Sequence, residues 1–249
     1  MQSPPLPQQL TPVREVFPVQ IAQGAVDGMG DWDGPARTLL EGGLVPPDVL
    51  TGMTLHLLAN QPRRPRTDGA KPKGAIEGGV WVREQVTYHA PMRLGEAIEI
   101  EGASVGRFSL RGRRYGVNTS TTRGEGGRLL ASNHTTGLLS YHKDPELADA
   151  VEGDEVAAPR ADHDAAADNP CLDALRSVQD GQEFGGRSAC VTLELMRVRD
   201  AFRDENPIHT DPEVAKREGL AAPIAGGSHV VAFLQAMLME AWGPESLLH

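Results

Sequence analysis

The feature that most restricts the fold is a segment near the C-terminal end that has the pattern of a helix with almost no polar face. We expect Ser228 to cap this helix and Gly243-Pro244 to end it. A helix of this kind must be buried, because soluble monomers rarely expose a continuous apolar patch of more than a few hundred Å². Its apolar residues are Val230, Val231, Phe233, Leu234, Ala236, Met237, Leu238 and Ala241.

The chain stops at His249, so no later strands are left to cover this helix. The cover must come from the sheet of the preceding part of the chain, from a partner subunit, or from residues beyond those given. The preceding part already has a helix for its own sheet to wrap. We therefore favour a partner or further residues, and both a natural and a truncated C-terminus stay open.

A first block, residues 11–143, has the order of one short strand, one helix and an antiparallel meander. The strand is expected at 14–20 and the helix at 48–60, where Asp48 is placed to cap it after two prolines. Segments rich in β-branched and aromatic residues, separated by turn signals, then predict four strands. These are 80–88, 97–105, 109–121 and 128–141, so the block is expected to be α+β.

Residues 144–170 are rich in alanine and acidic residues and lack apolar periodicity, which indicates a solvated linker. A second block, residues 171–249, follows it. There we expect a short strand near 190–193 and a helix over 194–202.

A shorter helix is expected next in the second block. Asp211 is placed as its N-cap, Pro212 as its first residue and Gly219 as its left-handed stop.

Composition excludes several classes of function. The formal net charge is −10, which argues against nonspecific binding to nucleic acid or to an anionic membrane. Cys171 and Cys190 are too few for a disulfide framework and lack the paired spacing of a zinc site, so we expect two small buried side chains and no metal. The sequence has neither a signal-peptide pattern nor an apolar run of about twenty residues, and we expect a cytoplasmic protein.

Residues 204–211 read Asp-Glu-Asn-Pro-Ile-His-Thr-Asp and are the best candidate for chemistry. Pro207 disfavours the α conformation at Asn206, so we expect an irregular loop between two helices. Such a loop can turn the side chains of Asp204 and His209 toward one point. A carboxylate and an imidazole that share one water can each give or take a proton near neutral pH.

This pattern resembles the signature of the MaoC-like, R-specific enoyl-CoA hydratases: Asp, one residue, Asn-Pro, an aliphatic residue, His, one residue, Asp. In that family a small helix and a turn ending in His-Gly precede a long central helix. Here Gly226 stands in the place of the histidine, and Ser228 in the place of the methionine that usually follows. The specific resemblance covers 191–242, while the first block resembles, more weakly, the degenerate N-terminal half of double-hot-dog dehydratases.

The resemblance implies an α+β double hot-dog fold, in which an antiparallel sheet wraps round a central helix and the second half is apparently incomplete. The first block would be non-catalytic and would widen the acyl site. The activity implied is that of a hydro-lyase of fatty acid metabolism, which hydrates 2-enoyl thioesters to R-3-hydroxyacyl thioesters or dehydrates the latter. Coenzyme A or an acyl carrier protein would carry the acyl group, and no other cofactor is expected.

The resemblance also implies the roles of individual residues. Asp204 and His209 would be the acid–base pair, and Asn206 would orient the site. The backbone amide of Gly227, at the start of the apolar helix, is well placed to stabilise negative charge on the thioester oxygen.

Weaker candidates lie outside this segment. Arg63, Arg64 and Arg66 belong to a basic loop that could meet the phosphates of coenzyme A or of a carrier-protein arm, although a solvated loop is the simpler account. Ser228 is a weak candidate for a substrate contact. His229 is expected to be structural.

Two other functions stay open. A hot-dog thioesterase would hydrolyse the same thioester, but residues 204–211 fit the hydratase signature better. A non-catalytic subunit that binds acyl chains or completes a partner's fold would account for the lost family histidine and the abrupt C-terminus. In each case we expect a homo-oligomer, or a partner subunit that covers the C-terminal helix.

Overall fold

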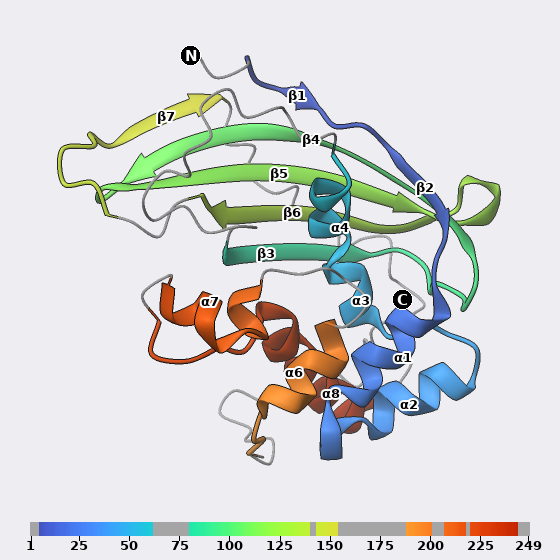
Figure 1. The fold of residues 1–249 in the computed structure, drawn as a ribbon. Coiled ribbons are helices and arrows are strands. Elements are labelled where there is room, and N and C mark those ends of the chain that lie inside the picture. Colours follow the sequence, from blue (N-terminus) through green and yellow to red (C-terminus); the bar gives the residue numbers. More distant parts are fainter. Residues whose placement is uncertain are drawn as a thin grey trace, which may run out of the picture.

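The computed structural model describes residues 5–61, 80–139, 143–153, 188–200, 207–217 and 220–243. Within these ranges a curved antiparallel sheet lies over a group of helices, all on one side of it (Figure 1).

The described strands form one seven-stranded sheet, in which β4 pairs with more strands than any other. The sheet has the order β1–β4–β5–β6–β3, and β2 and β7 also pair with β4. Because β4 has 14 residues, it is long enough to pair with β5 along one edge and with three short strands along the other. The strands are β1 (Gln8–Gln9), β2 (Val13–Val16), β3 (Val80–Tyr88), β4 (Ala97–Leu110), β5 (Arg113–Arg123), β6 (Leu129–Leu138) and β7 (Ala150–Gly153).

The helices form two groups. In the first block they are α1 (Val19–Asp27), η1 (Gly30–Trp32), α2 (Gly34–Glu41), α3 (Pro47–Thr51), α4 (Met53–Ala59) and η2 (Glu125–Gly127). In the second block they are α6 (Leu193–Asp200), η4 (Pro207–His209), α7 (Pro212–Arg217) and α8 (Gly227–Trp242).

α3 and α4 cross the inner face of the sheet from β3 toward β4. Near β3 the hydroxyl of Thr51 lies 2.9 Å from that of Tyr88. Further along, the hydroxyls of Thr54 and Ser120 are 2.7 Å apart. Leu57 of α4 reaches β4, where a Cβ on Gly102 would lie 2.7 Å from the Leu57 Cδ2 atom, so the close packing requires glycine. The sheet therefore wraps round a helix, as the family resemblance implies.

The predicted helix at 48–60 exists but is divided at Gly52, and Asp48 does not cap it. The N-cap position of α3 is Pro46, and Asp48 lies in the first turn with its side chain buried. Its carboxylate instead pairs with Arg199 of the second block.

Four other predictions need correction. The strand expected at 14–20 ends at Val16, because Pro18 precedes the first residue of α1. The segment expected as linker contains β7, which pairs with β4. Residues 190–192 form no strand, since α6 begins directly after them. Cys190 is exposed, not buried.

The start of α8 also differs from the prediction, since Gly226 and not Ser228 occupies its N-cap position. By contrast, the Asp211 cap of α7 and the end of α8 before Gly243 are confirmed. Residue 219, the expected stop of α7, lies outside the described residues, as does Cys171.

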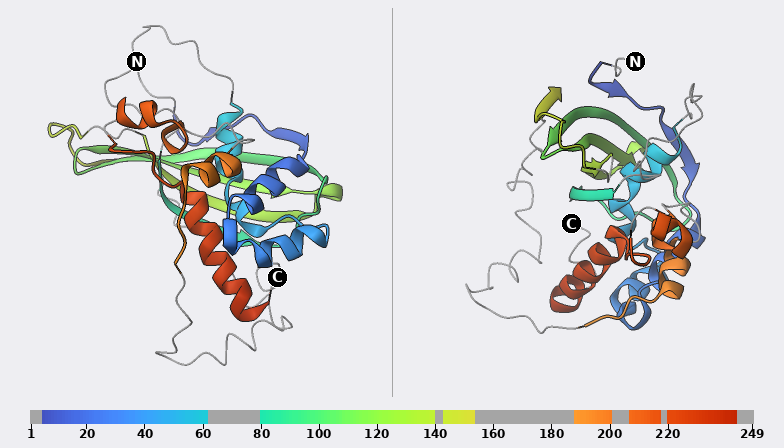
Figure 2. Two further views of the ribbon diagram at one scale, coloured as in Figure 1. Left: turned by 60° about the horizontal axis from the view of Figure 1, so that its bottom comes forward. Right: turned by 60° about the vertical axis from the view of Figure 1, so that its left-hand side comes forward.

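One face of α8 is covered by helices of the first block. Figure 2 shows this long red helix next to the blue helices, and α8 contacts α2 and α3. Ala232, Ala236 and Met239 belong to the same buried core as α1 to α4. The first block thus supplies more cover than expected, and it does so mainly with its helices.

The opposite face of α8 remains open to solvent. Val230, Leu234 and Leu238, one turn apart along the helix, are 54%, 56% and 37% exposed. We call these three residues the apolar stripe. Among the described residues no helix has the length and hydropathy needed to cross a membrane.

A buried arginine joins the two blocks. Arg199 of α6 is 1% exposed, and its guanidinium Nη2 lies 2.5 Å from the Asp48 carboxylate. Nη1 donates to the Ala25 carbonyl at 2.6 Å, and Nη2 also donates to the Ser228 carbonyl at 3.1 Å. α6 lies so close to α1 that a Cβ on Gly28 would be 2.5 Å from the Arg199 Cβ. One side chain therefore ties together α1, α3, α6 and α8.

We predict that Arg199→Met lowers the free energy of unfolding by about 3–5 kcal/mol, because it leaves the Asp48 carboxylate buried without its partner. Chemical denaturation followed by circular dichroism measures the change. The double variant Arg199→Met/Asp48→Leu should lose less than the sum of the single changes. Arg37→Met is the control, since it breaks two partly exposed ion pairs, with Asp27 and Asp33, each worth ~1 kcal/mol or less. Equal losses of unfolding free energy in Arg199→Met and Arg37→Met would contradict the prediction.

Candidate active site at the start of helix α8

The structure places some of the predicted site residues and not others. His209, Gly227 and Ser228 are described, whereas Asp204 and Asn206 lie outside the described residues. Residues 63, 64 and 66 of the basic loop also lie outside them. The geometry of the site is therefore built from the histidine and from the start of α8.

His209 is held in one orientation by a backbone carbonyl. It ends η4, between α6 and α7, and its Nδ1 atom lies 2.8 Å from the carbonyl oxygen of Ile224. A carbonyl oxygen can only accept a hydrogen bond, so Nδ1 carries a proton. In the neutral ring the lone pair is then on Nε2, which is the arrangement that a general base needs.

The loop that carries His209 is supported from both sides. Ile208 is fully buried. Arg197 of α6 donates from Nε to the Thr210 carbonyl at 3.2 Å. The Asp211 carboxylate accepts from the amides of Glu213 and Val214 at 2.8 and 3.3 Å. These contacts fix the position of the ring relative to both neighbouring helices.

Gly226 lies beside the His209 ring. A Cβ built on Gly226 would be 3.9 Å from Nε2 of His209 and 3.4 Å from Oγ of Ser228, which are ordinary contact distances. Its φ and ψ of −65° and 150° suit any residue. The backbone therefore does not demand glycine here, and the missing side chain leaves space next to Nε2.

Gly227 begins α8 and is exposed. The first N–H groups of a helix lack partners inside the helix and carry partial positive charge. Trp81 of β3 packs closely against this residue, since a Cβ on Gly227 would be 3.0 Å from the Trp81 ring. Trp81 is a neighbour of the site that the sequence did not indicate, because nothing in a strand pattern shows which residue meets a distant helix.

The two residues after Gly227 point into the protein. The Ser228 side chain is buried, and its Oγ accepts from Nε of Arg199 at 3.3 Å, so its contact is with the junction of the blocks. His229 is fully buried with its ring centroid 6.3 Å from that of Phe233. The ring of Phe233 in turn lies edge-on to Trp32. This surrounding fits the structural role expected for His229.

A line of polar side chains crosses the inner face of the sheet near Trp81. The register aligns Glu84 with Thr135, Thr135 with Asn118, and Asn118 with Ser104, on four adjacent strands. We call these four residues the polar row. Ser104 donates to Asn118 at 2.7 Å, and the amide of Asn133 donates to Glu84 Oε1 at 3.2 Å. Burial raises the pKa of the Glu84 carboxyl from 4.5 to about 7.

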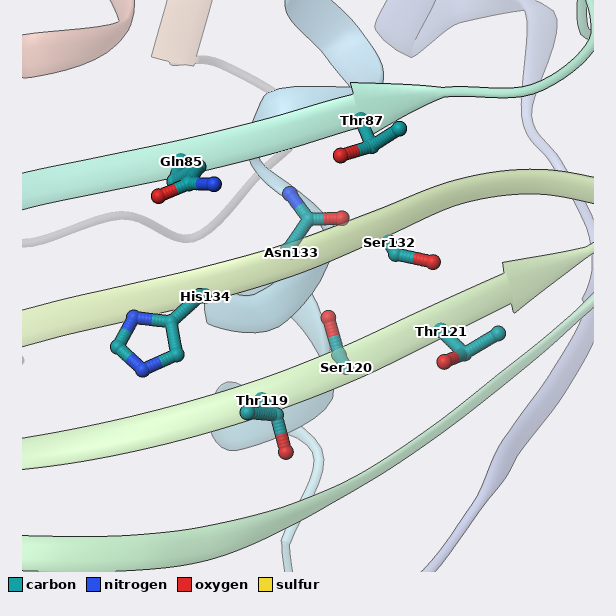
Figure 3. A pocket seen from close by; sticks show the side chains of 8 residues that line it. All are labelled: Gln85, Thr87, Thr119, Ser120, Thr121, Ser132, Asn133 and His134. Carbon is teal, nitrogen blue, oxygen red and sulfur yellow. The ribbon is translucent and has the colours of Figure 1, made fainter. Parts of the chain in front are cut away.

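A separate pocket of about 210 Å³ lies on the outer face of the sheet (Figure 3). Strand alternation turns six of its side chains away from α3 and α4, and none of His209, Gly227 and Ser228 lines it. Its lining residues are Gln85, Thr87, Thr119, Ser120, Thr121, Ser132, Asn133 and His134. No metal-binding group of three or more His, Cys, Asp or Glu occurs in the described part of the chain.

The raised pKa of Glu84 predicts a pH-dependent stability. Between pH 4.5 and about 7 the folded protein holds a proton that the unfolded chain releases, so the free energy of unfolding falls as the pH rises through this window. The full loss is about 3 kcal/mol. Urea denaturation at pH 5 and pH 8 should show it in the wild type and not in Glu84→Gln. Glu101→Gln, at an exposed position of β4, should keep the pH dependence of the wild type. If Glu84→Gln keeps this pH dependence as well, the Glu84 carboxyl is not its cause.

The C-terminal part of the chain matches a known protein family. Residues 194–248 match the family model described as MaoC like domain. This range includes His209 and Gly227. No curated protein is similar enough to the sequence to count as a match.

Several solved structures share the fold. A MaoC-like dehydratase has 17% identity and a TM-score of 0.64, with 94% of this chain and 77% of that chain covered. The full-length peroxisomal multifunctional enzyme type 2 of Drosophila melanogaster has 16% identity and a TM-score of 0.61, with 93% and 37% covered. A Mycobacterium tuberculosis protein with a double hot-dog fold has 14% identity and a TM-score of 0.54, with 94% and 74% covered.

Identities this low show the fold alone, and the family model adds the nature of the C-terminal part. The protein therefore shares an α+β fold, an antiparallel sheet with helices, with MaoC-like and double hot-dog proteins, and its residues 194–248 match the model of the MaoC like domain.

Proposed function

We propose that the protein reversibly hydrates 2-enoyl thioesters to R-3-hydroxyacyl thioesters, with Asp204 and His209 as its acid–base pair. The observation that carries the proposal is the hydrogen bond of His209 Nδ1 to the Ile224 carbonyl, which leaves Nε2 to act as a base near the start of α8. The match of residues 194–248 to a dehydratase family supports the same reaction class.

Hydration adds one water across the C2=C3 bond. A base removes a proton from water, the oxygen bonds to C3, and an acid delivers a proton to C2. His209 and Asp204 would share these two roles around one water, and dehydration would run the same steps backwards. Asn206 would orient the pair. The oxidation state of the carbon chain as a whole does not change, so the proposal needs no redox cofactor.

Negative charge develops on the thioester oxygen as the enolate forms. The amide of Gly227 is our candidate donor, because it lies at the positive end of α8. A backbone donor also explains why Gly226 can replace the family histidine without removing this function. Coenzyme A or an acyl carrier protein would present the acyl group, and Arg63, Arg64 and Arg66 stay candidates for its phosphates.

The test is to incubate the full chain with crotonyl-CoA and longer 2-enoyl-CoAs, and to follow both the enoyl absorbance and the release of free thiol. The enoyl absorbance should fall without thiol release. Asp204→Asn and His209→Ala should each lower the rate at least about a hundredfold, as expected for a lost acid–base group. His89→Ala is the matched control, since His89 is an exposed histidine that bonds to Ser132.

Two outcomes would contradict the proposal. Thiol release without hydration would favour a thioesterase. Neither reaction, even with a partner subunit added, would favour a subunit that only binds acyl chains.

We also propose that a second polypeptide chain covers the apolar stripe of α8. Three exposed aliphatic side chains on one helix face make up an unusual surface for a protein that acts alone. Sedimentation of the wild type should show an assembly, and Leu234→Glu should shift it toward the monomer. Leu110→Glu, at an exposed leucine of the sheet, is the control. If the wild type is monomeric, the chain that covers the apolar stripe must be a different subunit. If Leu234→Glu leaves the assembly unchanged, the apolar stripe is not part of the contact between subunits.

The cytoplasmic location stays a prediction.

A further inference from the structure

The inner face of the sheet changes character along the strands. At the row of Tyr88, Ala131 and Ile100 it packs against the core. One row further, the Asn133 side chain donates to the carbonyls of Leu50 and Thr51. These hydrogen bonds join the sheet to α3. The next row is the polar row, and all four of its side chains can hydrogen-bond. A fold that wraps its sheet round a core helix needs no such row.

Several polar atoms at the β3 end of the polar row are buried without a partner. They are Oε2 of Glu84 and Oγ1 of Thr135, which faces it on β6, together with Oδ1 of Asn133 in the row before. The indole Nε1 of Trp81, on the same strand as Glu84, also lacks a hydrogen-bond partner. The Asn133 side chain is only 4% exposed. Buried polar atoms in folded proteins nearly always have a hydrogen-bond partner, so such atoms on two neighbouring strands indicate a place for a ligand or for ordered water.

These atoms lie next to the candidate active site. Trp81 packs against Gly227 at the start of α8. Two turns later Gln235 donates to the hydroxyl of Tyr88 at 2.6 Å, so side chains of β3 meet α8 at two points. Glu84 is on the inner face of β3 between Trp81 and Tyr88. An acyl chain that leaves the Gly227 amide along β3 therefore meets Glu84 and then the rest of the polar row.

We propose that Glu84 and Asn133 bind a hydroxyl group on the acyl chain of the substrate, beyond the reacting carbons. The proposal rests on the proposed function and deepens it by naming the substrate class. A hydroxyl both donates and accepts, so it can donate to Oε2 of Glu84 or Oδ1 of Asn133 and accept from the indole of Trp81. A plain aliphatic chain would leave all three atoms buried without partners, and a site of this kind discriminates against it.

The test measures binding of saturated probes, which cannot be hydrated. Isothermal titration calorimetry compares hexanoyl-CoA with 4-, 5- and 6-hydroxyhexanoyl-CoA on the full chain. At least one hydroxylated probe should bind about tenfold more tightly than hexanoyl-CoA, the gain typical of a hydrogen bond to a buried charged or polar group. Equal affinity for all four probes would overturn the proposal and leave ordered water as the partner of these atoms.

Variants locate the effect. Glu84→Met should abolish the preference, whereas Gln85→Met, one residue along the same strand and on the opposite face, should keep it. If Glu84→Met does not fold, Trp81→Phe decides, because it removes the indole N–H together with the five-membered ring and keeps an aromatic side chain, and it should reduce the preference about threefold. A preference unchanged in every variant that folds would overturn the proposal.

The same probes separate this proposal from the proposed function. Selective binding of a hydroxylated probe by a protein that does not hydrate enoyl-CoAs would support the subsite and refute the hydratase. Hydration of enoyl-CoAs without any preference among the saturated probes would do the reverse.

Discussion

The buried guanidinium of Arg199 is the interaction on which the rest of the structure depends. It is bonded to the Asp48 carboxylate, to the Ala25 carbonyl and to Ser228, so four helices from both blocks meet at one charge. A charge this far from solvent is tolerated only where its partners are all in place, because its desolvation is costly. The arrangement therefore fixes α6 and the first turn of α8 against the first block.

Because α6 and α8 are held in this position, main-chain groups can form much of the candidate site. The His209 ring is oriented by the Ile224 carbonyl, and the proposed donor to the thioester is the Gly227 amide. Neither contact depends on the side chain at position 226. A site made of backbone groups on a firmly held helix tolerates a change in a neighbouring side chain better than one that relies on that side chain. This explains how the chain can lack the family histidine and still present the imidazole and the helix start side by side.

The first block does more than cover this site. Its inner face bonds to α3 and α4 through a few polar side chains, and one row further it carries the polar row, from Glu84 on β3 to Ser104 on β4. Burial of the polar row is unfavourable for folding, and the raised pKa of Glu84 is one sign of it. A sheet that needed only stability would carry aliphatic residues there. The polar row is therefore best explained by what the site binds, which gives the block expected to be non-catalytic a part in specificity.

The sequence by itself predicted many of the elements and the resemblance to MaoC-like proteins. Strand β3 was predicted at its observed bounds, β5 and β6 were found within a few residues, and the pattern of Asp211 and Pro212 marked the start of α7, because alternation and capping are local properties of the chain. The resemblance of residues 204–211 to the MaoC-like signature agrees with the family match, although Asp204 lies outside the described residues. Only the tertiary structure showed that Asp48 pairs with Arg199, that Trp81 packs on Gly227, and that Glu84 and Asn133 lie side by side. These pairs join residues far apart in sequence, and a side chain's local pattern carries no information about the distant element that it meets.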